Sequence, residues 1–71
     1  MNVASEEFIT VVRKFLESKY GVVQLDVSRV YVRDDEVEAA GMFRREADRV
    51  WRRFTVLIDR KTMIVKAYGS R

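Results

Sequence analysis

The chain has 71 residues and a mass of 8.4 kDa, enough for one small domain with a single core, and we expect residues 1–71 to form that domain. Hydrophobic residues make up 48% of the chain and charged residues 35%, which is typical of globular domains and unlike disordered chains. The absence of Cys and His removes disulfides, thiol nucleophiles, the usual zinc ligands and the commonest neutral-pH base, so we predict a non-catalytic protein with no cofactor and no metal.

Residues 5–20 show the spacing of an amphipathic helix. Apolar residues recur three and four positions apart, so they would form one stripe along the helix. These residues are Phe8, Ile9, Val11, Val12, Phe15 and Leu16. Ser5 is placed to cap the N-terminus, and Gly21 is placed to end the helix in the left-handed conformation. We therefore expect a helix with one buried face.

From Val22 onward the period of the apolar residues changes from 3.6 to 2, which predicts β-strands. The strands are expected at residues 22–32, 37–44, 50–58 and 63–68, with residues 69–71 fraying. The apolar phase slips at Ser28 and Arg29, which indicates a β-bulge that bends the first strand. Gly41, inside the second strand, indicates a further bend or a close approach of two backbones.

The short connections between these strands fix how the strands pair. Parallel pairing needs a crossover of about a dozen residues, so strands joined by short turns must be antiparallel neighbours. The predicted fold is α+β, with one N-terminal helix packed on a curled four-stranded antiparallel β-meander. The expected core residues are Phe8, Val12, Phe15, Leu16, Leu25, Val37, Phe54, Val56 and Ile58.

One helix covers one face of a sheet, and the pattern of the other face is not polar. Strand alternation turns apolar and aromatic residues outward, among arginines. The residues expected there are Arg29, Tyr31, Ala40, Met42, Trp51, Arg53, Leu57, Lys66, and Ile64 or Tyr68. Such patches usually mark contact surfaces, and Trp, Tyr and Arg are enriched at interface hot spots. We predict a homodimer, or binding to another protein, through an interface of Trp51, Leu57, Tyr31, Met42 and Arg53.

Besides a groove for a peptide or an apolar ligand, two other interpretations of this face stay open. In one, bases of a single-stranded nucleic acid stack on aromatic residues while cations contact phosphates. That interpretation uses Arg29, Tyr31, Trp51, Arg53 and Lys66. In the other, the long stems of arginines cover Trp51 and Leu57, and the face binds nothing.

Charge is distributed unevenly along the chain. Residues 1–43 carry five Lys/Arg and eight Asp/Glu, a net charge of −3, whereas residues 44–71 carry nine and three, a net charge of +6. This division fits an acidic partner such as nucleic acid, but it also fits attraction between the two halves, within one chain or between subunits.

One carboxylate cluster offers chemistry of its own, and it consists of Asp34, Asp35, Glu36 and Glu38. Grouped carboxylates can bind a hard cation or act in acid–base catalysis. This run lacks the spaced Asp/Asn pattern and the Gly of a calcium loop, so its position favours a solvated hairpin turn. None of the four serines has a His to activate it, and no glycine-rich phosphate loop is present.

The N-terminal residues show neither the charged start nor the apolar stretch of a signal peptide. No apolar run approaches the roughly 20 residues of a membrane span. We therefore expect a cytoplasmic protein without a membrane partner.

The stretch from Arg53 to Tyr68 contains an alternating strand that ends in Asp59, turns, and returns as a second strand. This stretch resembles the closing hairpin of small domains of the PepSY type, and the order of one helix and four strands resembles the cystatin-like arrangement. The resemblance implies a non-catalytic domain that binds another protein or modulates a larger assembly. Those families usually place Gly in the turn where this chain has Arg60 and Lys61, and no functional residue is transferred from them.

Overall fold

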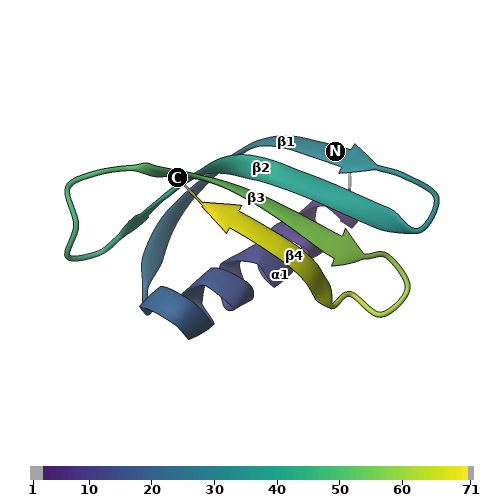
Figure 1. Ribbon diagram of the computed structural model, residues 1–71, viewed down its shortest axis with the longest axis horizontal. Coiled ribbons are helices and arrows are strands. Elements are labelled where there is room, and N and C mark those ends of the chain that lie inside the picture. The colour runs from purple at the N-terminus through teal and green to yellow at the C-terminus, as the bar shows by residue number, and fades with distance from the viewer. Residues whose placement is uncertain (1–2, 71) are drawn as a thin grey trace.

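The computed structural model describes residues 3–70 and shows one helix lying across one face of a four-stranded sheet (Figure 1). The elements are α1 (Val3–Tyr20), β1 (Val23–Val32), β2 (Glu36–Arg45), β3 (Arg52–Asp59) and β4 (Val65–Ser70). The strand order is β1-β2-β3-β4, and every neighbouring pair is antiparallel. The predicted α+β meander is confirmed, and this topology is compatible with cystatin-like folds.

The two ends of α1 differ in how well the sequence predicted them. The helix begins at Val3, so Ser5 lies inside its first turn and the prediction of a Ser5 cap is wrong. At the other end Gly21 has a φ of +80°, and its N–H donates to the carbonyl of Glu17 at 2.9 Å. This is the left-handed glycine cap that the sequence predicts.

The bulge in β1 is present and explains the glycine opposite it. The register shifts between Val27 and Arg29, which leaves Ser28 as the extra residue. Gly41 pairs with Val27, and a Cβ built on Gly41 would lie 2.1 Å from the backbone oxygen of Asp26. The backbones of β1 and β2 therefore approach each other so closely that only glycine fits, as the sequence predicts for this position.

The ends of β3 and β4 differ from the prediction. β3 begins at Arg52, so Val50, predicted to lie in this strand, precedes it and is 68% exposed. β4 begins at Val65 rather than residue 63, because Met63 takes a φ of 61° in the turn. Residues 69 and 70, expected to fray, belong to β4. Hydrogen bonds within the two loops set these ends, and a period of two along the chain cannot reveal such bonds.

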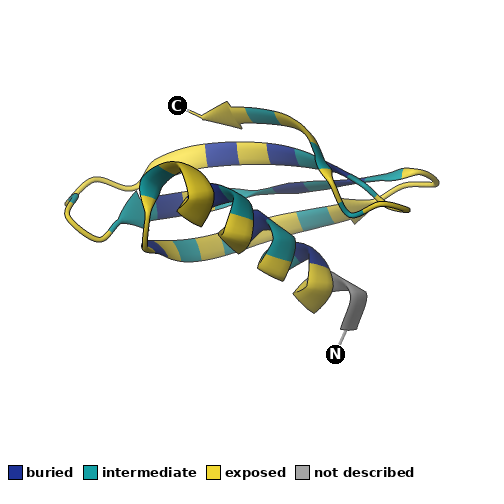
Figure 2. Ribbon diagram, turned by 90° about the horizontal axis from the view of Figure 1, so that it is seen from below, coloured by how far each residue is buried: buried dark blue, intermediate teal, exposed yellow. Residues whose placement is uncertain are grey.

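The core lies between α1 and the sheet, and along β3 its buried residues Phe54, Val56 and Ile58 alternate with more exposed ones (Figure 2). Seven predicted core residues are buried: Phe8, Val12, Leu16, Val37, Phe54, Val56 and Ile58. Phe15 and Leu25 are partly buried against them, and the prediction missed Val23, Ala39 and Phe43. The phase of β3 is therefore as predicted, and its alternate residues face away from the helix.

Candidate interaction surface

The sheet face opposite α1, called the outer face here, has no element of residues 3–70 packed on it (Figure 2). The strand registers arrange its side chains in rows. The central rows are Tyr31, Glu38, Leu57 and Ala67; then Arg29, Ala40, Thr55 and Gly69; then Asp26, Met42 and Arg53. The predicted interface residues Tyr31, Leu57, Met42 and Arg53 thus share this face.

Apolar side chains on the outer face are partly exposed but do not form one continuous patch. Tyr31 is 49% exposed and Met42 is 36% exposed, while Leu57 is half-buried. Glu38 stands between Tyr31 and Leu57 in one row, and Arg53 is the cross-strand partner of Met42. The face therefore combines separate apolar projections with charged neighbours.

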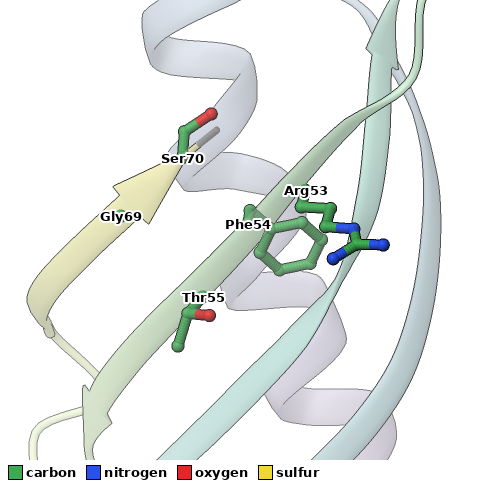
Figure 3. Close-up of a pocket in the computed structure, with 5 residues that line it drawn as sticks. All are labelled: Arg53, Phe54, Thr55, Gly69 and Ser70. Carbon is green, nitrogen blue, oxygen red and sulfur yellow. The ribbon is translucent and has the colours of Figure 1, made fainter.

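Small residues between these projections leave two shallow hollows. One, of about 330 Å³, is lined by Arg53, Phe54, Thr55, Gly69 and Ser70 (Figure 3). The other spans β1 to β3, with Arg29 and Arg53 among its lining residues and Ala40 and Gly41 between them. Both arise because glycine, alanine and threonine leave little side-chain volume above the strands. The outer face therefore has both projecting side chains and hollows into which side chains of a partner could fit.

Tyr68 lies on the helix side of the sheet, so the suggestion that it faces outward is wrong. Its ring contacts Phe15 with centroids 5.2 Å apart, and its hydroxyl lies 3.1 Å from that of Tyr20. Burial is the main cause that raises the pKa of Tyr68. The reversal follows from a second bulge, in which Lys66 is the extra residue between Val65 and Ala67. Ile64, the other candidate, lies in the turn before β4 and is 64% exposed.

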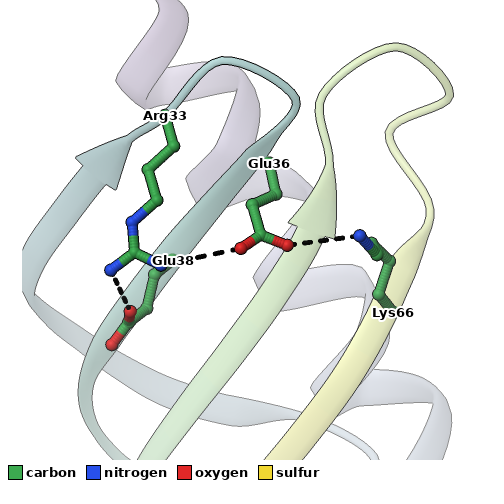
Figure 4. A network of polar contacts seen from close by, with 4 residues as sticks. All are labelled: Arg33, Glu36, Glu38 and Lys66. Atoms are coloured by element: carbon green, nitrogen blue, oxygen red, sulfur yellow. Dashed lines mark hydrogen bonds and ion pairs between the residues drawn. The ribbon is translucent and has the colours of Figure 1, made fainter.

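Lys66 belongs to an ion-pair network rather than to an exposed basic surface (Figure 4). Its ammonium lies 3.2 Å from a carboxylate oxygen of Glu36, and a hydrogen bond to Glu36 raises the pKa of Lys66. Arg33 contacts both Glu36, at 3.6 Å, and Glu38, at 3.3 Å. Tyr31 is the cross-strand neighbour of Glu38. This end of the outer face is therefore unfavourable for phosphate, and two of the predicted nucleic-acid residues, Tyr31 and Lys66, lie in it.

The acidic turn is tied to the neighbouring hairpin by backbone contacts. The carbonyl of Asp35 accepts the N–H of Arg60 at 3.1 Å, and the guanidinium of Arg60 donates to the carbonyl of Arg33 at 2.9 Å. Within residues 3–70, no three His, Cys, Asp or Glu side chains come together as a metal-binding group.

The loop between β2 and β3, residues 46–51, forms a second feature at the far end of the sheet (Figure 1). Asp48 makes a two-point ion pair with Arg45, and the guanidinium of Arg44 donates to the carbonyl of Asp48 at 2.8 Å. The hydrogen bond from Arg45 lowers the pKa of Asp48, and the same contact raises the pKa of Arg45. These contacts tie Asp48, in the loop, to the last two residues of β2.

Trp51 lies in this arginine-rich end and not in the centre of the outer face. It precedes β3, is 41% exposed, and has the guanidinium of Arg44 5.8 Å from its ring centroid. The sequence predicted Trp51 as an exposed residue but did not reveal that it leaves the sheet. The alternation of apolar and polar residues in β3 extends back to residue 50. Only the contacts of Asp48 show that the pairing of β3 with β2 does not extend so far.

Comparisons with known proteins add no relative: no family model matches the chain, and neither a curated protein nor a solved structure matches it. In the part of the chain that is described, no helix combines the length and the apolar character needed to cross a membrane.

Proposed function

We propose that this chain is a non-catalytic assembly module that forms a homodimer through the outer face, with Leu57, Met42 and Tyr31 as apolar contacts and Arg53 beside them. Trp51 lies at the rim of this interface. The observation that carries the proposal is that partly exposed apolar side chains and hollows floored by small residues occur on the same face. An interface between two identical surfaces needs both, because each copy contributes the projections that fill the hollows of the other.

The size of the face sets the strength expected for this dimer. Four strands about 4.8 Å apart and about 20 Å of β3 give roughly 400 Å² for each copy. A dimer would then bury roughly 800 Å², less than the ~1,200–2,000 Å² of stable complexes. We therefore expect a dissociation constant in the micromolar range. Location in the cytoplasm and the absence of catalysis stay predictions from the sequence.

Sedimentation equilibrium over a concentration series, at low and at high salt, tests this proposal. We expect a reversible dimer whose affinity changes little with salt, because its contacts are mainly apolar. Leu57→Asp places a charge in the proposed interface and should leave a monomer. Ile64→Asp makes the same kind of change at an exposed residue of the β3–β4 turn and should dimerise like the parent chain.

Met42→Asp repeats the test on another strand, and circular dichroism verifies that each variant is folded. A parent chain that stays monomeric at several hundred micromolar would refute the proposal. So would folded Leu57→Asp and Met42→Asp variants that dimerise as strongly as Ile64→Asp.

A further inference from the structure

We infer that the end of the sheet formed by the β2–β3 loop binds single-stranded nucleic acid, with Trp51 stacking on a base and Arg44, Arg49 and Arg52 contacting phosphates. This site begins at the pair of Phe43 and Arg52, the last pair between β2 and β3, and includes the loop beyond it. It is separate from the centre of the outer face, so the inference does not depend on the proposed dimer.

The charge of this end is concentrated by the hairpin itself. Residues 44–53 contain five arginines and two acidic residues, a net charge of +3. One of those acids, Asp48, is paired with Arg45. Among residues 3–70, no carboxylate forms an ion pair with Arg44, Arg49 or Arg52. The charge of these three guanidinium groups is therefore not balanced by an ion pair, although Arg44 also donates to the carbonyl of Asp48.

All of these cations are arginines, which matters for the kind of ligand. A guanidinium presents a planar fork of donors that fits a phosphate with two hydrogen bonds, and its flat face stacks on aromatic rings and bases. Arg44 already lies over the Trp51 ring, which remains 41% exposed. An exposed aromatic ring among arginines is the arrangement that binds unpaired bases.

A single strand fits this end better than a duplex does. In a duplex the bases stack on one another and are not free to stack on Trp51, whereas the bases of a single strand are. An anionic membrane would meet the same charge together with exposed Val50 and Val22. Two isolated valines are a small apolar surface beside three arginines and a tryptophan, so the nucleic acid is the occupant that we propose.

Fluorescence anisotropy with a labelled oligothymidine of about 12 nucleotides, titrated between about 50 and 200 mM salt, tests the inference. We expect binding that weakens as salt rises, with a slope of about 0.7 for each phosphate contact. Trp51→Leu should weaken binding about 5- to 150-fold through loss of stacking. The pair Arg49→Ala and Arg52→Ala should lower the slope by about 1.4.

The matched control combines Lys14→Ala with Lys61→Ala, two exposed cations of α1 and the β3–β4 turn. It removes the same charge as the arginine pair but should leave the slope unchanged. Equal losses from both pairs would overturn the inference, because binding would then follow net charge alone. No binding to the oligonucleotide at the lowest salt, with or without binding to phosphatidylglycerol vesicles, would overturn it as well.

Discussion

Gly41→Ala is the substitution that tests the sheet geometry most directly. The added Cβ would lie 2.1 Å from the backbone oxygen of Asp26 and 2.8 Å from the Cα of Val27. Both atoms belong to the backbone of β1, so no side-chain rotation can relieve the clash. β1 would have to move by about 1 Å at its bulge, with loss of pairing to β2.

This clash should cost about 3 kcal/mol, the upper part of the range for overpacked sites. A domain of this length is expected to be stable by about 4–11 kcal/mol, so the variant would lose a large share of its stability. Gly69→Ala provides the matched control, because a Cβ there meets no atom within 4 Å and Gly69 is two strands away in the neighbouring row. We expect it to lie within about 0.5 kcal/mol of the parent chain.

Urea unfolding followed by circular dichroism measures the free energy of unfolding of the parent chain, Gly41→Ala and Gly69→Ala under identical conditions. Gly21→Ala adds a second comparison, because its φ of +80° should cost about 1 kcal/mol without any clash. The expected order of destabilisation is Gly41→Ala, then Gly21→Ala, then Gly69→Ala. Free energies for Gly41→Ala and Gly69→Ala that agree within about 0.5 kcal/mol would show that β1 and β2 do not approach so closely at the bulge.

Three further outcomes are expected from the packing and the turns. Leu16→Ala removes a fully buried side chain and should destabilise the protein by about 2–5 kcal/mol in the same urea assay. A loss of stability below about 1 kcal/mol would contradict this expectation. Tyr20→Phe removes the 3.1 Å hydroxyl contact with Tyr68 and should cost about 0.5–1.5 kcal/mol. The carboxylate of Asp59 accepts the N–H groups of Lys61 and Thr62, which lowers the pKa of Asp59 from 3.8. Asp59→Asn should therefore be less stable than the parent at neutral pH, and the difference should vanish as the pH falls through that lowered pKa; a gap independent of pH would contradict this account.

The fold was predictable because two periods along the chain are unambiguous. The helix stripe and the alternation in β3 gave the element order and the phase of the sheet. The shift of the apolar spacing from two to three residues between Val27 and Val30 revealed the first bulge. The same spacing between Val65 and Tyr68 marks the second bulge at Lys66, and missing it placed Tyr68 on the wrong face.

The surfaces were predictable only in part, because ion pairs and strand pairing between residues far apart in the sequence decide which exposed side chains are free to bind a partner. Alternation placed Leu57, Met42 and Tyr31 on the outer face correctly. It could not show that Glu36, 30 positions away along the chain, takes up the charge of Lys66. Nor could it show that the pairing between β2 and β3 stops at Arg52, so that Trp51 lies outside the sheet.

The structure shows where the acidic and basic halves of the chain meet. Of the four ion pairs among residues 3–70, one joins the acidic half of the chain to the basic half, between Lys66 and Glu36. Attraction between the halves within one chain therefore accounts for little of the asymmetry. The antiparallel hairpin instead brings Arg44 and Arg45 at the end of β2 next to Arg52 and Arg53 at the start of β3. Asp48 pairs with Arg45 there, but no ion pair among residues 3–70 engages Arg44, Arg52 or Arg53. An anionic partner therefore offers an electrostatic gain at that end, and salt should weaken that binding while leaving an apolar dimer in place.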